Sequence, residues 1–264
     1  MKKTFSLAMV ALLMSACTQS PTGREQLLFN NESTMAQMGT QSFDELKKKE
    51  KIDSDPKTNQ YVQCVAGAIT RVLPAEQQGD WEVVVFDSKE VNAFALPGKK
   101  IGVYSGLLKV AQTPDQLAAV IGHEVGHVLA HHSNERLTQN QIYSGVSVLA
   151  AVALGLSNVD NKGLYMAALG VGATVGVLLP YSRKHESEAD QIGLELMAKA
   201  GFDPNQAVVL WHNMEQNAGK TPPELLSTHP SPASRIQALS DEVPKVMPYY
   251  QKAAIHPQCK RATN

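Results

Sequence analysis

The sequence predicts an α+β protein that is mostly helical, with a small sheet beside one central helix. Three observations lead to this class. Capping side chains followed by proline mark several helix starts, and strand patterning is confined to one stretch, residues 81–104. The composition, 43% hydrophobic and 19% charged over 264 residues, is that of a globular protein. We therefore expect one folded domain, from about Glu25 to residue 264.

The helix starts are the clearest local signals. Each pairs an acceptor side chain, which satisfies an unpaired backbone N–H, with a proline at a position that needs no donor. They are Asp55-Pro56, Thr113-Pro114, Asp203-Pro204 and Ser231-Pro232.

The strands are expected between the first two helix starts. Residues 81–86, 91–96 and 101–104 are rich in apolar and β-branched side chains. Pro97-Gly98 is the turn signal between the last two. A small mixed sheet follows from this pattern.

The first residues have the pattern of a secretory signal. Two lysines precede an apolar run, residues 5–14, that is too short to span a bilayer. Small residues then precede Cys17, a pattern similar to the lipobox of bacterial lipoproteins, although Met14 stands where Leu is usual. We expect residues 1–16 to be a signal peptide, Cys17 to carry lipid and residues 17–24 to form a tether. The alternative is an ordinary signal peptide with a chance cysteine.

The residue after the cysteine indicates a destination by similarity to bacterial lipoproteins. Thr18 is not the Asp that retains such proteins at the inner membrane. We therefore expect a lipid-anchored protein in the cell envelope, on the periplasmic face of the outer membrane. Disulfides persist in that oxidising compartment, so Cys64 and Cys259 are either bonded to each other or buried as separate thiols.

The balance of charges excludes one class of partner. The chain has 24 Lys and Arg residues against 25 Asp and Glu residues. Such a balance creates no long-range positive field for phosphate backbones. We expect no nucleic-acid partner.

The helix that starts at Thr113 carries the strongest chemical signal. Residues 123–127 read HEVGH, and on a helix the two histidines share one face. Two neutral imidazoles can hold one zinc ion, which also needs a third protein ligand and an open position for water. Glu124 is the expected base for that water. A helix that carries two histidines by chance is the alternative, but the apolar flanks of the motif favour the metal site.

The residues directly after the motif do not supply the third ligand. Ala130 and Ser133 stand where metzincins have the Gly and His that lead to it. His131 and His132 are expected to point elsewhere on the helix, where they either support a zinc ligand from outside the ligand set or lie at the surface. Glu135 is too close along the chain to fold back easily.

A later acidic cluster is the expected source. Glu186 and Asp190 are four residues apart at the start of a helix, so they share a face. One carboxylate can bind the metal while the other accepts the remaining ring proton of a ligand histidine. Glu188 is expected to point away. The alternative is an acidic helix start that the helix dipole favours.

Four segments together resemble the gluzincin peptidases, the group that includes the CAAX prenyl endopeptidases, HtpX, BepA and LoiP. They are NAFALPG at residues 92–98, HEVGH, Glu186-x-x-x-Asp190, and His229-Pro230 followed by Arg235. The resemblance implies that His123, His127 and Glu186 hold the zinc. It also implies that Glu124 is the catalytic base and that Asp190 lies behind the ligands, as the group often described as a proton donor.

The resemblance implies a substrate site as well. An extended substrate would add as a further strand to a sheet edge that flanks the active-site helix. An ordinary hairpin is the alternative, and Lys99 stands where many relatives have a second glycine. The residues of that edge are Asn92, Ala93, Phe94 and Ala95.

The His-Pro segment has two interpretations. In relatives the histidine lies near the metal and the arginine near the reacting carbonyl, which assigns catalytic roles to His229 and Arg235. Alternatively, the segment is a helix start and Arg235 pairs with a carboxylate. A neutral His229 is also a candidate for the open zinc position, which would make the resting enzyme latent.

Two uncharged apolar runs follow the motif helix, at residues 148–156 and 163–179. The second has 17 residues and four glycines, at the lower limit for a bilayer span. We favour helices packed over the active-site region or resting at a membrane surface.

The predicted function is peptide-bond hydrolysis by a zinc metalloendopeptidase with one zinc ion per chain. Its expected substrates are misfolded or misassembled envelope proteins, with the outer-membrane assembly machinery as a further partner. A periplasmic chaperone or binding scaffold with a latent protease site is the alternative. An integral-membrane protease is a third.

Overall fold

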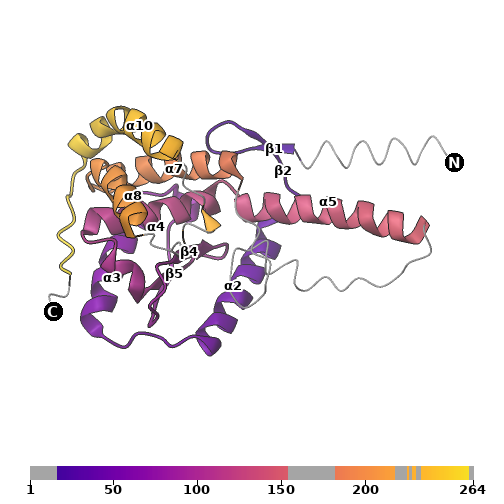
Figure 1. Ribbon diagram of the computed structural model, residues 1–264, viewed down its shortest axis with the longest axis horizontal. Coiled ribbons are helices and arrows are strands. Elements are labelled where there is room, and N and C mark those ends of the chain that lie inside the picture. Colours follow the sequence, from indigo (N-terminus) through magenta and orange to yellow (C-terminus); the bar gives the residue numbers. More distant parts are fainter. Residues whose placement is uncertain (1–16, 154–181, 218–224, 226–227, 230–232, 262–264) are drawn as a thin grey trace.

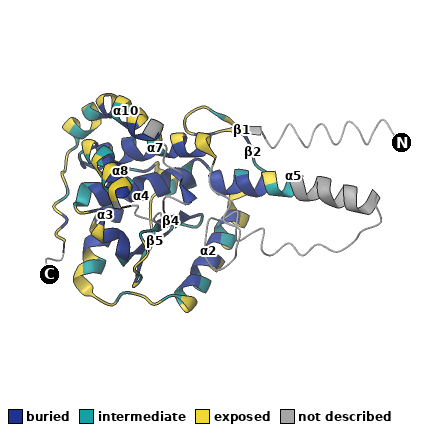
Figure 2. Cartoon of the chain, in the orientation of Figure 1, coloured by how far each residue is buried: buried dark blue, intermediate teal, exposed yellow. Residues whose placement is uncertain are grey.

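The computed structural model describes residues 17–153, 182–217, 225, 228–229 and 233–261. The expected fold class is confirmed, because helices surround a small sheet and the helix that carries HEVGH lies at the centre (Figure 1). That helix is α4 (Pro114–Leu129), and it is buried along most of its length (Figure 2). Its helical neighbours are α3 (Pro56–Arg71), α7 (Arg183–Lys199) and α8 (Asn205–Asn217), with α10 (Ala233–Lys252) packed on α7 and α8.

The expected helix starts agree with the structure where it describes them. A carboxylate oxygen of Asp55 accepts the backbone N–H of Thr58 at 2.9 Å. The hydroxyl of Thr113 accepts the N–H of Gln116 at 3.2 Å. The start expected at residues 231–232 lies outside the described residues, and α10 is described from Ala233 onward.

The sheet is mixed, as expected. Its strands are β3 (Glu82–Phe86), β4 (Ala93–Leu96) and β5 (Lys100–Tyr104), in the order β3-β5-β4. Strand β5 is parallel to β3 and antiparallel to β4. Within the part of the chain that the structure describes, β4 is therefore an edge strand, and it packs against α4.

The turn between β4 and β5 shows what Lys99 changes. Gly98 and Lys99 both have positive φ, 87° and 61°, a region that suits glycine better than lysine. The ammonium of Lys99 donates to the backbone carbonyl of Gln78. Lysine thus occupies a left-handed position and makes a side-chain contact that glycine lacks.

A long helix, α2 (Glu32–Lys49), was not predicted from the sequence. It packs on the sheet and supplies Phe43 to an aromatic cluster. The other rings of that cluster are Phe86, Phe94 and Tyr104.

The N-terminal segment differs from the expected tether. Strand β1 (Cys17–Gln19) pairs with β2 (Glu25–Leu27) in an antiparallel hairpin. The hairpin is fixed to the domain because the Arg24 guanidinium binds the carboxylates of Glu135 and Glu188. The described structure therefore has residues 17–27 packed on the domain rather than forming a free tether, while acylation of Cys17 stays a prediction.

After α4 the chain continues into α5 (His132–Ala153), which extends away from the body of the molecule (Figure 1). The first apolar run begins in α5, and the rest of that run and all of residues 163–179 lie outside the described residues. In the described ranges, no helix is both long and apolar enough to span a bilayer.

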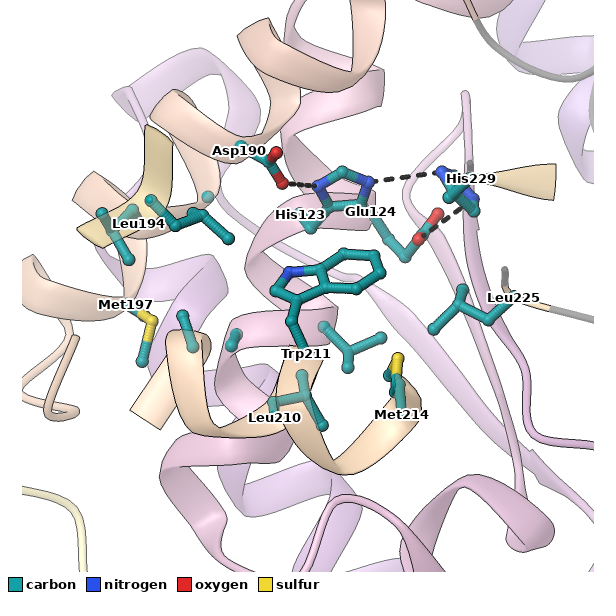
Figure 3. A pocket seen from close by; sticks show the side chains of 15 residues that line it. His123, Glu124, Asp190, Leu194, Met197, Leu210, Trp211, Met214, Leu225 and His229 are labelled. Carbon is teal, nitrogen blue, oxygen red and sulfur yellow. Dashed lines mark hydrogen bonds and ion pairs between the residues drawn. The ribbon is translucent and has the colours of Figure 1, made fainter. Parts of the chain in front are cut away.

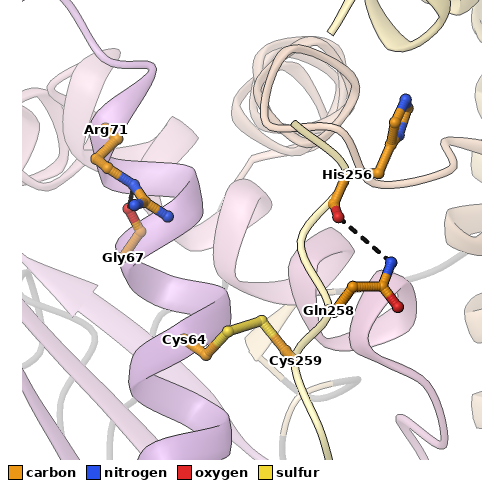
Figure 4. The surroundings of a disulfide bond; sticks show 6 residues. All are labelled: Cys64, Gly67, Arg71, His256, Gln258 and Cys259. Atoms are coloured by element: carbon orange, nitrogen blue, oxygen red, sulfur yellow. Dashed lines mark hydrogen bonds between the residues drawn. A yellow bond between two sulfur atoms is a disulfide. The ribbon is translucent and has the colours of Figure 1, made fainter. Parts of the chain in front are cut away.

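The C-terminal segment is tied across α3 by a disulfide between Cys64 and Cys259, whose Cα atoms are 5.7 Å apart (Figure 4). Of the two alternatives left open, the structure has the bonded pair. Because the crosslink closes a loop of 195 residues, it restricts the unfolded chain, an effect on the order of 2–4 kcal/mol. Arg261 adds hydrogen bonds to the carbonyls of Leu108 and Gln112.

Candidate metal centre

Helices α4 and α7 approach closely because glycines meet at their crossing. A Cβ on Gly193 would lie 2.6 Å from the backbone nitrogen of His123, and one on Gly122 would lie 2.8 Å from the carbonyl of Gly193. Any larger side chain would push the helices apart. The crossing therefore brings the HEVGH motif against the acidic start of α7.

At this crossing His123, His127 and Glu186 form a buried cluster. The Nε2 atoms of the two histidines are 3.1 Å apart, and they lie 3.4 Å and 3.5 Å from the two carboxylate oxygens of Glu186. Donors held tetrahedrally about 2.0–2.1 Å from a zinc ion are about 3.3–3.4 Å from one another. The observed separations fit one zinc ion.

The charges of the cluster also favour a cation. Burial lowers the pKa of His123, but hydrogen bonds with Asp190 and Glu186 outweigh burial and raise that pKa to about 9. Burial would raise the pKa of Glu186, yet the neighbouring histidines hold it well below its ordinary value. Burial holds the pKa of His127 low, so its ring is neutral. Two imidazoles and a carboxylate are a donor set that zinc prefers.

His229 contributes a fourth donor. Its Nδ1 lies 3.3 Å from His123 Nε2 and 3.1 Å from Glu186 Oε1. The donor atoms of the four residues all lie within 4.8 Å of one another. The structure thus brings a nitrogen of His229 close enough to share one ion with the other three donors.

Glu124 lies beside this cluster, next to an apolar pocket lined by Trp211, Met214 and Leu225 (Figure 3). Its Oε1 is 3.4 Å from His229 Nε2. Burial raises the pKa of the Glu124 carboxyl. A carboxylate in this place is suited to accept a proton from a group at the metal.

Asp190 lies behind His123, on the side away from His229 (Figure 3). Its Oδ1 is 3.0 Å from His123 Nδ1, the ring nitrogen that does not face the cluster. This is the position of a carboxylate that orients a ligand histidine.

Arg235 holds two carboxylates of α7. Its Nε and one terminal nitrogen bind Asp190 at 2.7 Å and 2.6 Å, and the other terminal nitrogen lies 2.8 Å from Glu186. The guanidinium stacks on Trp211, 4.3 Å from the ring centroid. The structure therefore places Arg235 in ion pairs with carboxylates, the second of the two interpretations from the sequence.

Two further residues lie behind His127. His132 was expected either to support a ligand from outside the ligand set or to lie at the surface, and the structure has the first of these: it is fully buried with its Nδ1 2.8 Å from His127 Nδ1. Glu188, expected to point away, is 5% exposed with Oε2 3.0 Å from His132 Nε2. Burial lowers the pKa of His132 to about 4, so its ring is neutral. The paired histidines just after the motif were the one local signal that could have found this connection.

The edge strand has the backbone arrangement that a substrate strand needs. The N–H of Tyr104 donates to the carbonyl of Asn92 at 3.1 Å. Alternate residues of an antiparallel strand bond to the same neighbour, so the backbone groups of Ala93 and Ala95 point to the outer edge. The Asn92 side chain accepts the N–H of Ala93 at 2.9 Å, and the Phe94 side chain is buried in the aromatic cluster.

Comparisons with known proteins agree with this geometry. Residues 56–243 match Peptidase family M48. The mitochondrial metalloendopeptidase OMA1 of Schizosaccharomyces pombe is 38% identical over 185 residues, 69% of this chain and 52% of that protein. OMA1 of Danio rerio is 35% identical over 246 residues, covering 87% and 51%. The β-barrel assembly-enhancing protease of Escherichia coli is 27% identical over 205 residues, covering 76% and 42%.

These relatives correct the expected location. Several of them, from fungi, a plant and vertebrates, are named as mitochondrial, which contradicts a place on the periplasmic face of the outer membrane. The chain spans about half the length, or less, of the curated relatives it matches.

The same comparisons confirm the resemblance to gluzincin peptidases and, at the level of the family, the expected class of zinc metalloendopeptidase. Because the match covers the sheet, the motif helix and the acidic helix, the chain belongs to peptidase family M48, whose metallopeptidases use zinc.

Proposed function

We propose that this chain is a zinc metalloendopeptidase that cleaves unfolded or misassembled proteins. The observation that carries the proposal is the Glu124 carboxylate beside a buried donor set of two histidines and a glutamate. A base next to a metal is the arrangement that activates water for peptide hydrolysis. The family match supports the same reaction.

The residues divide the work between them. Zinc held by His123, His127 and Glu186 would polarise the scissile carbonyl and lower the pKa of the attacking water. Glu124 takes the proton of that water and passes it to the leaving amine, a task for which its raised pKa is suited. Asp190, whose Oδ1 lies 3.0 Å from Nδ1, would keep the His123 ring in place.

The substrate class follows from the edge strand. The outward carbonyl of Ala93 and the outward backbone groups of Ala95 would bind an extended chain through its own backbone, whatever its sequence, while the N–H of Ala93 is bound by the Asn92 side chain. A folded protein rarely offers such a segment, whereas an unfolded one does. The similarity to a protease named for β-barrel assembly supports membrane proteins in an unfinished state as substrates.

We also propose that His229 closes the resting site, as its Nδ1 at the fourth corner of the donor set suggests. His229→Ala, with zinc retained, should then raise basal proteolysis of an unfolded substrate. If His229 instead stabilises the tetrahedral intermediate, the same change should lower the rate about 10²-fold or more. An unchanged rate would exclude both roles.

The proposed function is tested by digestion of casein with zinc, with a chelator and with Glu124→Gln, in both the wild-type and the His229→Ala backgrounds. We expect about one zinc ion per chain and a rate that falls about 10²-fold or more in Glu124→Gln. The position of His229 also favours a second candidate, a binding scaffold with a latent site. Unfolded-protein binding that survives Glu124→Gln, without cleavage in either background, would favour the scaffold.

A further inference from the structure

A second set of buried polar side chains lies behind His127, outside the zinc donor set. His127 Nδ1 is 2.8 Å from His132 Nδ1, and His132 Nε2 is 3.0 Å from Glu188 Oε2. The same carboxylate oxygen accepts the Nε–H of Arg24 at 2.7 Å. We call His132, Glu188 and Arg24 the Glu188 arm.

The hydrogen-bond donors and acceptors of this arm follow from the orientation of the His127 ring. His127 directs Nε2 at the other zinc donors, so a neutral ligand ring carries its proton on Nδ1. That N–H donates to His132 Nδ1, which must then be an acceptor. A neutral His132 with an acceptor Nδ1 carries its own proton on Nε2 and donates it to Glu188. Each hydrogen bond sets the tautomer of the next ring.

A bend in the backbone between α4 and α5 brings His132 against His127. In an unbroken helix a residue five positions after His127 would lie about 140° round the helix axis from it. Instead α4 ends at Leu129, and His131 has a φ of 55°, a region that residues other than glycine rarely adopt. The break turns the chain so that α5 begins with His132 packed on His127.

The N-terminal hairpin fixes the outer end of the arm. Besides Arg24, the hydroxyls of Ser20 and Thr22 donate to Oε1 of Glu188. The remaining guanidinium nitrogens of Arg24 bind Glu135 at 2.9 Å and 2.7 Å. The carboxylate of Glu188 therefore accepts bonds on both oxygens from one short segment, β1 to β2.

We propose that the Glu188 arm positions His127 for zinc, which makes the N-terminal hairpin a part of the metal centre. The inference rests on the proposed zinc site. Partners of this kind typically contribute 10- to 100-fold to metal affinity. The effect should fall along the arm, from His132 to Glu188 to Arg24.

The test is zinc affinity of the full chain, measured by competition with a chelator for His132→Phe, Glu188→Gln and Arg24→Gln. Glu195→Gln is the matched control, because Glu195 is on the same helix but pairs only with Lys199, at the surface. We expect the zinc Kd to rise about 10- to 100-fold in His132→Phe, less in Arg24→Gln, and not in the control. The visible spectrum of bound Co²⁺ should change in His132→Phe and Glu188→Gln.

A merely structural role would lower the thermal stability of the metal-free protein without altering affinity or the Co²⁺ spectrum. A folded His132→Phe protein with the affinity of the control overturns the inference. If His132→Phe does not fold, Arg24→Gln decides, since Arg24 is partly exposed at the end of the arm, and an affinity equal to the control overturns the inference there too. Wild-type protein that binds no zinc would overturn the proposed function itself.

Discussion

The two histidines of α4 that we propose as zinc ligands are held in different ways. His123 contacts the Asp190 carboxylate directly at 3.0 Å, and Arg235 from α10 holds that carboxylate. The Nδ1 atom of His127 instead contacts a second histidine, which contacts the carboxylate of the Glu188 arm. We call Asp190 and Arg235 the Asp190 arm.

The difference follows from positions on one helix. Asp190 is one turn beyond Glu186, so both project toward α4. Glu188 is two residues beyond Glu186, about 200° round the helix, and faces elsewhere. The ring of His132 lies between His127 and the Glu188 carboxylate and contacts both. Helix α7 thus supplies three carboxylates: Glu186 as the proposed zinc ligand, Asp190 behind His123, and Glu188 behind His132 and His127.

The largest effect on zinc content should come from replacing the ligand Glu186 rather than a carboxylate of either arm. Glu186→Gln removes one of three protein ligands, so zinc content should fall from about one per chain to near zero. Glu188→Gln should keep zinc with lower affinity. Metal analysis after gel filtration measures both. Tight zinc binding in Glu186→Gln together with loss in Glu188→Gln would reverse the assignment of these carboxylates.

The next effect concerns the Asp190 arm alone. Asp190→Asn keeps the shape but weakens the acceptor for His123 Nδ1, so zinc affinity should fall about 10- to 100-fold. The loss should be at least as large as in Glu188→Gln, because the contact is direct. Chelator competition on both variants ranks the arms. A larger loss of zinc affinity in Glu188→Gln than in Asp190→Asn would contradict this ranking. It would mean that a carboxylate acting through His132 affects zinc binding more than one in direct contact with a ligand histidine.

The two arginines should differ in stability. Arg235→Met removes the cation that binds the buried Glu186 and Asp190 carboxylates and leaves them to their histidine neighbours, which costs about 3–5 kcal/mol. Arg24→Met should cost less, since 23% of its side chain is exposed. Denaturant unfolding of the metal-free proteins measures both. Equal losses in the free energy of unfolding would mean that the Arg24 ion pairs of the hairpin stabilise the fold as much as those of Arg235 on α10.

The smallest effect is a pH dependence at the outer end of the Glu188 arm. Burial would raise the pKa of Glu135, but hydrogen bonds from His185 and Arg24 outweigh burial and lower that pKa from 4.5 to about 2. A lowered pKa in the folded state stabilises the protein above the unfolded value near 4.5, and this contribution is lost as pH falls through about 2.

Thermal unfolding of the metal-free protein at neutral and acid pH tests this pH dependence. The melting temperature of the wild type should fall more than that of Glu135→Gln as pH is lowered from 5 toward 2, about the window between the two pKa values. Parallel curves would mean that the Glu135 pairing with Arg24 adds no stability in solution.

The sequence was enough to put His123 with His127, and Glu186 with Asp190, on one helix face each, because residues four apart on a helix share a face wherever the helix lies. It was not enough for the Glu188 arm. That arm needs the break at His131 and a hairpin folded back from residues 17–27, and neither follows from local periodicity. Paired histidines after a helix end gave only a hint.

Helix α2 was missed for a related reason. Its buried face includes Gly39 and Ser42 in place of an apolar stripe. Gly39 is required because a Cβ there would lie 2.0 Å from the carbonyl of Pro97. The close contact with the β4–β5 turn requires glycine at position 39. Glycine there interrupts the apolar stripe from which the helix could have been predicted.

Arg24 and Arg235, the two arginines that brace the carboxylates of α7, stand near opposite ends of the described chain. A ribosome that has released residues 123–190 has made every zinc ligand but not the Arg235 that holds two of the buried carboxylates. The centre is therefore completed late in synthesis.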